Sequence, residues 1–272
     1  MTSNNKIIKN LVAIDLKKEF KSYDWIFIII MFFVLNLVSK FEVYNISLSF
    51  GNNFNWWDVL YNIIQNQYFV LSLFIPLIIY LVFRNLNINA SDENIIRYIN
   101  RKNFIISKII SSIIIIIAFI LLNIFISIIG SIGLSFSPIL SKSSEYIFST
   151  GVINLFNSPF VVILISIVLL ILSFTLIANI IILSSLFLKS NFVCLPAICL
   201  WGTSLVGMRI VGCKKLYGYA FINTNMLLHQ SLDISKHGVI ISICIMLILN
   251  LLLITISLKR IESFDFLGKA ED

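Results

Sequence analysis

Six long apolar runs constrain what this chain of 272 residues can fold into. The runs contain no carboxylate and no histidine, and they occupy residues 25–38, 68–83, 105–129, 160–188, 192–208 and 239–258. Hydrophobic residues make up 59% of the chain and charged residues 12%, against about 45–50% and about 25% in soluble domains. This composition excludes a soluble enzyme, a disordered chain and a secreted disulfide scaffold. It indicates a polytopic membrane protein.

The apolar runs predict an all-α fold with six transmembrane helices. A helix needs roughly 20 residues to cross the hydrocarbon core, so the shorter runs must borrow flanking residues. We expect a transmembrane domain over residues 25–260 and a tail over residues 261–272. The expected spans are about 25–41, 62–83, 104–130, 160–188, 192–211 and 239–258.

Residues 1–24 precede the first span and predict an amphipathic helix at the cytoplasmic surface of the membrane. Apolar residues recur there on a helical spacing, with lysines between them. Leu16 and Phe20 continue the apolar edge, and Lys17 and Lys18 lie beside them. Such a helix lies in the plane of the interface, with its lysines near the headgroups. The alternative is a frayed basic anchor.

The basic residues predict that both termini are cytoplasmic. Lys and Arg concentrate in the N-terminal segment, in loop 84–104 and in the tail, which share one side of a six-span topology. The positive-inside rule assigns that side to the cytoplasm. Residues 209–238 run against the rule, because they carry several basic residues on the opposite side. The net charge of +7 indicates contact with anionic lipid headgroups and not with nucleic acid. We expect a multi-pass protein of the plasma membrane.

The sequence carries no recognisable catalytic, cofactor-binding or metal-binding pattern. A P-loop requires a lysine directly after its second glycine, and Gly202–Gly207 and Gly207–Gly212 both lack it. The two histidines, His229 and His237, match no zinc-site spacing. The runs also lack the carboxylates and histidines of intramembrane proteases and proton-coupled carriers. We expect no enzymatic activity and no cofactor in this chain.

Four asparagines lie within the expected spans: Asn36, Asn123, Asn179 and Asn250. Hydrogen bonding between neighbouring helices is the favoured interpretation of such residues. A polar path for a substrate is the alternative.

Loop 84–104 has the pattern of a short amphipathic helix. Ile95, Ile96 and Ile99 fall on one helical face, and Arg97 and Arg101 fall on another. The apolar face of such a helix fits a groove on a soluble partner, while its charges fix the register. The alternative is that the basic residues only flank a span.

This loop resembles the loop between the second and third spans of ABC-2 type transporter permeases. That family has an acidic residue, an apolar helical stretch and an Arg, followed seven residues later by a Lys that opens the third span. Glu93, Arg101 and Lys108 match this pattern, and residues 16–21 resemble the family's interface helix. The family's Gly-Thr-Leu after the acid and its proline before the Arg are absent here.

The resemblance implies the membrane-spanning permease subunit of an ABC exporter. Its substrate would be amphipathic, or peptide-like or lipid-like, and antimicrobial peptides and bacteriocins follow by analogy. A separate cytoplasmic ATPase would hydrolyse the ATP, and a second permease subunit, identical or paralogous, would complete the path among membrane lipids. Glu93, Arg97, Arg101 and Lys108 would couple the chain to the ATPase. The rival functions are a membrane sensor or scaffold without transport, and an ATP-independent secondary carrier.

Overall fold

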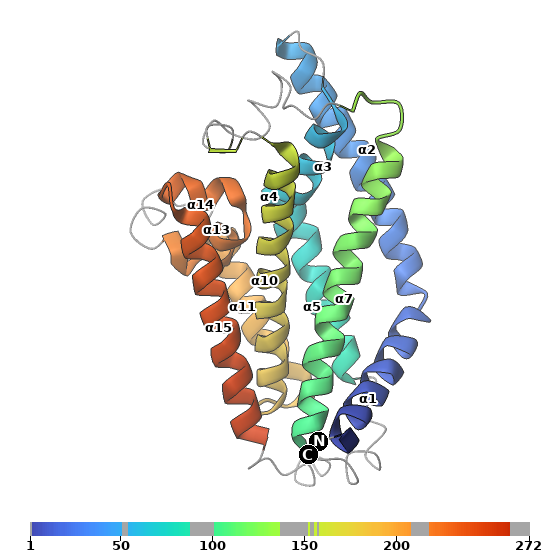
Figure 1. The fold of residues 1–272 in the computed structure, drawn as a ribbon, viewed down its shortest axis with the longest axis vertical. Helices are drawn as coiled ribbons and strands as arrows, with labels where there is room; N and C mark the ends of the chain where they lie inside the picture. The colour runs from blue at the N-terminus through green and yellow to red at the C-terminus, as the bar shows by residue number, and fades with distance from the viewer. Residues whose placement is uncertain are drawn as a thin grey trace.

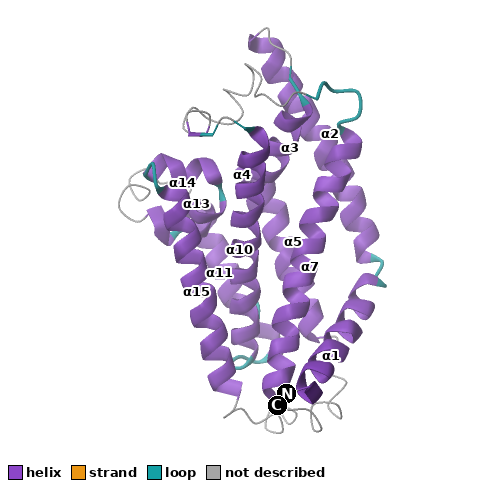
Figure 2. Ribbon diagram, in the orientation of Figure 1, coloured by secondary structure: helices purple, strands orange, loops and turns teal. Residues whose placement is uncertain are grey.

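The computed structural model describes residues 2–50, 54–87, 101–136, 152, 155–156, 158–207 and 218–261. These residues form an elongated bundle of helices that run roughly side by side along the long axis (Figure 1). Figure 2 shows that the described part is helix joined by short loops. Its only strand-like feature is one isolated bridge between Asn55 and Ser135. The predicted all-helical fold is confirmed for this part of the chain.

Five helical stretches of the described residues are long and apolar enough to cross a membrane. They are α2 (Asp24–Phe50), the stretch Gln67–Leu86, α7 (Arg101–Gly130), α10 (Pro159–Ser185) and α15 (Gly238–Arg260). The chain is therefore membrane-embedded. The expected span at 192–211 coincides with a shorter apolar stretch, Ser190–Val206, which contains η2 (Ser190–Phe192) and most of α11 (Leu195–Gly207).

The first two spanning stretches differ from the expected ranges. Helix α2 continues to Phe50 instead of ending near residue 41, because no glycine or proline interrupts the chain before Gly51. The expected second span at 62–83 is interrupted at Asn66, whose backbone is extended. The side chain of Asn66 accepts a hydrogen bond from the Tyr68 amide at 3.0 Å, which caps a new helix. Residues before this point form a separate buried helix, α3 (Trp56–Gln65).

The second spanning stretch contains a π-turn next to a proline, where one backbone carbonyl is left without a backbone donor. It runs through α4 (Gln67–Phe69), the π-turn η1 (Val70–Phe74) and α5 (Ile75–Asn87). With π spacing, the carbonyl of Leu71 would accept a hydrogen bond from residue 76, but Pro76 has no N–H. The indole Nε1 of Trp201 on α11 donates to that carbonyl at 2.6 Å instead. This bond ties α11 to the second spanning stretch.

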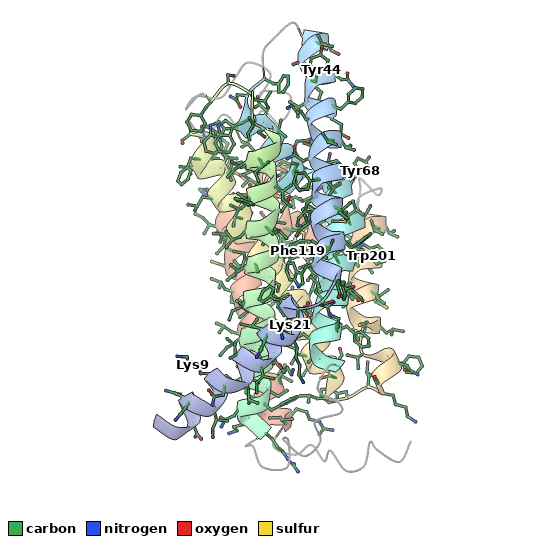
Figure 3. The ribbon with its side chains drawn as sticks, turned by 90° about the vertical axis from the view of Figure 1, so that its right-hand side faces the viewer. Lys9, Lys21, Tyr44, Tyr68, Phe119 and Trp201 are labelled. Atoms are coloured by element: carbon green, nitrogen blue, oxygen red, sulfur yellow. The ribbon has the colours of Figure 1, made fainter. Side chains whose placement is uncertain are left out.

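The centre of the bundle is an aromatic cluster that joins four elements. Phe32, Phe74, Phe119 and Phe174 come from α2, η1, α7 and α10, and all four are buried. The Phe119 ring makes edge contacts with the other three, at centroid distances of 4.9, 5.7 and 6.4 Å. Figure 3 labels Phe119 about midway along the bundle. Such contacts contribute ~0.5–1.5 kcal/mol each beyond the burial of their area.

The asparagines in the spanning helices differ in whether their side chains form hydrogen bonds between helices. Asn179 on α10 donates to Asn250 Oδ1 on α15 at 2.8 Å, so the predicted hydrogen bond between helices is confirmed for this pair. Asn36 is buried against Gly130, where an added Cβ would lie 2.1 Å from its Oδ1. Its amide has no hydrogen-bond partner among the described residues, so the same interpretation is wrong for Asn36 in this structure.

Part of the segment between α11 and α15 folds back onto the bundle. Two short helices, α13 (Ile222–Met226) and α14 (Leu228–Ile234), lie beside α10 and α15 at one end of the bundle (Figure 1). The Gln65 side chain accepts a hydrogen bond from the Leu228 amide at 2.6 Å, and Gln230 donates to Gln67 at 2.8 Å. These bonds hold the hairpin against the top of the second spanning stretch.

Helix α1 (Thr2–Phe20) lies at the opposite end and leaves the bundle at an angle. In Figure 3 the end of α1 that carries Lys9 extends away from the bundle, whereas Lys21 lies close to the other helices. The turn Lys21–Tyr23 separates α1 from α2, so the chain bends between the two helices. Residues 2–20 are therefore helical, as expected, and oblique to the spanning helices.

Candidate functional site

A buried lysine marks the point where α1 meets the bundle. Lys108 lies two turns into α7, and its side chain is fully buried. Its Nζ lies 3.0 Å from Asp15 Oδ1 on α1 and donates to the backbone oxygen of Asn85 at 2.9 Å. The Phe104 ring centroid is 5.5 Å from the same nitrogen. A charge this deep is tolerated only when it is paired and hydrogen-bonded, as it is here.

The sequence of α1 places its acids on the side that faces the bundle. Val12, Asp15 and Glu19 follow each other at spacings of three and four, which lie on one helical face, and all three are buried. Lys17 falls on the opposite face and Lys18 on the flank of the helix, and both are exposed. The helix therefore directs its negative charge inward and its positive charge outward.

Two other residues expected in the interface helix lie on its edges. Leu16 is half-buried and packs against the core. Phe20 is 45% exposed, and its ring centroid lies 5.1 Å from that of Trp25, the second residue of α2. This aromatic contact spans the bend between α1 and α2.

A second ion pair fixes the same bend. Arg84, near the end of α5, pairs with Glu19 and with Asp24. Its Nε donates to Glu19 Oε2 at 3.0 Å and its Nη1 to Ser22 Oγ at 2.8 Å, while Tyr80 donates to Asp24 at 3.0 Å. We call Asp15, Glu19, Asp24, Arg84 and Lys108 the elbow network, since they hold the bend between α1 and α2 against α5 and α7.

Burial shifts the acid–base equilibrium of one member of the elbow network. Desolvation raises the pKa of the Glu19 carboxyl above its ordinary value, and the hydrogen bond and charge of Arg84 offset this rise only in part. The pair therefore carries a desolvation cost that exposed ion pairs do not.

Asn85 connects the two halves of the elbow network. Its backbone oxygen accepts from Lys108, and its amide donates to Ser111 Oγ at 2.9 Å and to Ser112 Oγ at 3.4 Å on α7. The end of α5 and the start of α7 are therefore bound both to each other and to α1. These two ends flank residues 88–100 along the chain.

Two of the four predicted coupling residues, Arg101 and Lys108, lie in the described part of the chain and differ in exposure. Glu93 and Arg97 lie outside the described residues. Arg101 is the first residue of α7 and is exposed, whereas Lys108 is buried and contacts Asp15. Since a soluble partner cannot touch Lys108, any effect of this residue on coupling passes through its contacts with Asp15 on α1 and Asn85 on α5.

The sequence interpretation missed Asp15, Glu19 and Arg84 as members of a site. A signal was present, because Asp15 and Glu19 share the helical face that also carries Val12. Acids on the apolar face of a helix need buried cations, and Arg84 and Lys108 lie next to or within apolar runs.

The elbow network supports a role in positioning α1 against α5 and α7. Its members are held in ion pairs, and no group of three or more potential metal ligands occurs among the described residues. Comparisons with models of protein families, with curated proteins and with solved structures find no match to this chain.

Proposed function

We propose that this chain is the transmembrane permease subunit of an ABC-2 type exporter, energised by a separate cytoplasmic ATPase. The observation that carries the proposal is the elbow network. It joins α1 to the two helix ends that flank residues 88–100. This segment contains Glu93, which together with Arg101 and Lys108 of α7 resembles the loop pattern of that family.

The elbow network gives such a permease a way to transmit force. A partner that pushes on residues 88–100 would displace the end of α5 and the start of α7. Arg84 and Lys108 lie in these two elements and hold Glu19 and Asp15 of α1. Buried ion pairs tolerate little change in geometry, so the displacement passes to α1 through Glu19 and Asp15. The more exposed pair between Arg84 and Asp24 connects the same arginine to α2.

The proposed topology has six spans with both termini in the cytoplasm of a plasma-membrane protein. The fifth span of this topology is the expected segment 192–211, most of which falls in the apolar stretch Ser190–Val206. Helix α1 lies at the cytoplasmic interface, which its oblique direction and its exposed lysines support. A second permease subunit, identical or paralogous, completes the transport path.

The proposed substrate is an amphipathic, peptide-like or lipid-like molecule such as an antimicrobial peptide. Among the described residues, the fully or nearly fully buried charged side chains are Asp15, Glu19, Asp58 and Lys108. Three belong to the elbow network, and Asp58 caps α3. The middle of the bundle is therefore apolar, with scattered amides and hydroxyls, which suits a substrate that is itself partly apolar.

Transport into inside-out membrane vesicles tests the proposal. We expect a fluorescent amphipathic cationic peptide to accumulate only when ATP and the chain are both present. Collapse of the proton gradient by an uncoupler should leave accumulation unchanged. Accumulation that does not require ATP and is abolished by the uncoupler would identify a secondary carrier. A set of amphipathic peptides and lipids that all fail to accumulate would favour a sensor or scaffold.

A further inference from the structure

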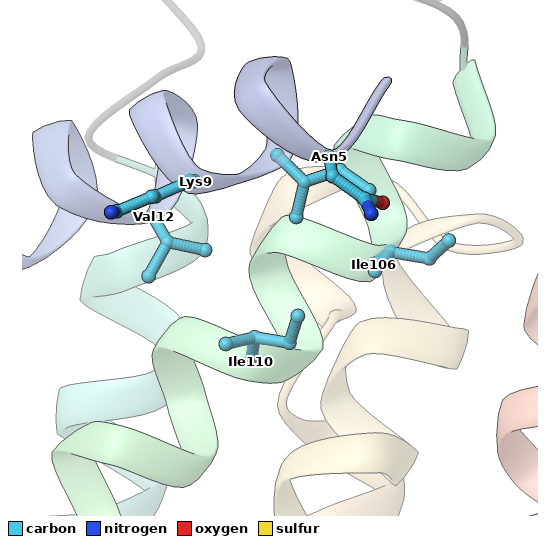
Figure 4. A pocket seen from close by; sticks show the side chains of 6 residues that line it. Asn5, Lys9, Val12, Ile106 and Ile110 are labelled. Carbon is cyan, nitrogen blue, oxygen red and sulfur yellow. The ribbon is translucent and has the colours of Figure 1, made fainter. Parts of the chain in front are cut away.

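A groove separates α1 from α7 on the outside of the bundle (Figure 4). Its volume is about 580 Å³, within the range of about 300–1,000 Å³ typical of small-molecule sites. Its walls combine an exposed amine and an amide with four aliphatic side chains, and the residues are Asn5, Ile8, Lys9, Val12, Ile106 and Ile110.

The two walls of the groove differ in chemistry. Ile106 and Ile110 stand one turn apart on α7 and present only hydrocarbon. The α1 wall adds Lys9 and Asn5, one turn apart, to its apolar residues. In Figure 4, both of these polar side chains extend from α1 above Ile110. A molecule that fills this groove needs an apolar chain beside a group that attracts an ammonium ion.

The charge on the surface of α1 indicates whether the bound group is an anion or a cation. Asp15 and Glu19 are the acids of this helix, and both are buried in ion pairs with the bundle. Lys6 and Lys9 are exposed. The outer surface of α1 near the groove is therefore cationic, and it complements an anion.

We propose that the groove binds one anionic phospholipid from the leaflet in which α1 lies. An acyl chain lies against Val12, Ile106 and Ile110, and the phosphate contacts the Lys9 ammonium with the Asn5 amide as a second donor. The bound lipid holds α1 at a fixed distance from α7 next to the elbow network. This inference rests on the groove and on the proposed position of α1 at the membrane interface, and it does not depend on transport.

Native mass spectrometry of the purified full chain tests the charge of the ligand. The probe is a mixture of equal amounts of phosphatidylglycerol and phosphatidylcholine. We expect wild type to retain one phosphatidylglycerol in preference to phosphatidylcholine. Lys9→Gln should lower that preference about fivefold, which corresponds to the ~1 kcal/mol of one basic residue near an anionic surface. Lys17→Gln is the matched control, because Lys17 is exposed on the same helix but does not line the groove.

A second pair of variants tests the groove itself. Ile106→Trp should fill it and lower the retention of both lipids, whereas Leu121→Trp on the exposed surface of α7 should not. Equal losses for Lys9→Gln and Lys17→Gln would show that only the general charge of α1 attracts lipid, and would overturn the site. An unchanged preference in Lys9→Gln, or a bound mass that matches a peptide, would overturn it as well.

Discussion

The Nζ of Lys108 and the Oδ1 of Asp15 are 3.0 Å apart, although 93 positions separate the two residues in the chain. Their side chains are 0% and 3% exposed. A buried pair of this kind is stable only as a pair, because removal of one partner leaves a charge without compensation in an apolar surrounding. It therefore fixes α1 to α7 more firmly than surface charges on the same helix would.

The first prediction concerns the stability of this pair. Lys108→Met alone should lower the free energy of unfolding by about 3–5 kcal/mol, since Asp15 is left buried without its cation. The double variant Asp15→Leu/Lys108→Met should recover most of the loss, because a hydrophobic pair of similar volume removes the desolvation cost. Thermal unfolding of the detergent-solubilised protein measures both effects.

Lys17→Met is the matched control, and it should change the melting temperature little, because Lys17 is exposed on α1. If the double variant is as unstable as Lys108→Met, the loss comes from packing and not from an unpaired charge. That result would remove the ion pair from the account of how α1 is held.

The second prediction is a pH dependence that originates at Glu19. Because burial raises its folded-state pKa above the value in the unfolded chain, Glu19 binds a proton more readily when α1 is docked. Its contribution to stability is therefore full below its ordinary pKa of 4.5 and is lost as the pH rises through the raised folded-state value. Melting temperatures measured from pH 4.5 upwards should fall more steeply in wild type than in Glu19→Gln. Parallel pH profiles for the two proteins would refute this assignment.

The third prediction concerns the carbonyl that Pro76 leaves without a backbone donor. Trp201→Phe should destabilise the protein by about 1–3 kcal/mol, because the buried Leu71 oxygen loses its hydrogen bond. Pro76→Ala should rescue part of that loss, since alanine restores an N–H in the right turn of the helix. The measurement compares the melting temperature of the double variant with that of Trp201→Phe. A double variant no more stable than Trp201→Phe would contradict the proposed link between Pro76 and the Leu71 carbonyl.

The fourth prediction is a coupling between two asparagines in the membrane. Asn179 and Asn250 share a hydrogen bond of 2.8 Å, and Asn250 also donates to the Leu172 and Met246 carbonyls. A double-mutant cycle with leucine at both positions should give a coupling energy of about 0.6–1.7 kcal/mol. A coupling energy near zero would mean that each asparagine is held by its own backbone contacts.

Hydrophobic pattern alone predicted most of the described bundle. The expected spans at 104–130, 160–188 and 239–258 lie within a few residues of α7, α10 and α15, because long apolar runs can satisfy their backbone groups in lipid only as helices. The break at Asn66 was missed, since it depends on a side chain that caps one helix and not on hydrophobicity. The fold-back of α13 and α14 depends on distant glutamine contacts that no local pattern reveals.

The elbow network was predicted only in fragments. Lys108 was singled out by resemblance, but its partner Asp15 lies far away in the chain and meets it only when α1 docks. Local spacing does show that Asp15 and Glu19 share a helical face, so this part of the network could be predicted. The direction in which α1 leaves the bundle could not be predicted in this way, because it depends on the turn at Lys21–Tyr23.

The most direct test of the central claim is the identity of the protein that binds residues 84–104. The tagged full chain should be purified from its own host in mild detergent, and co-purifying proteins identified by mass spectrometry. We expect a P-loop ATPase with wild type and with the control Lys17→Glu, and its loss with Arg101→Glu or Glu93→Lys. Recovery of the chain without any ATPase, under conditions that preserve other membrane complexes, would contradict the account. An ATPase that still binds both loop variants at the wild-type level would contradict the role given to this loop.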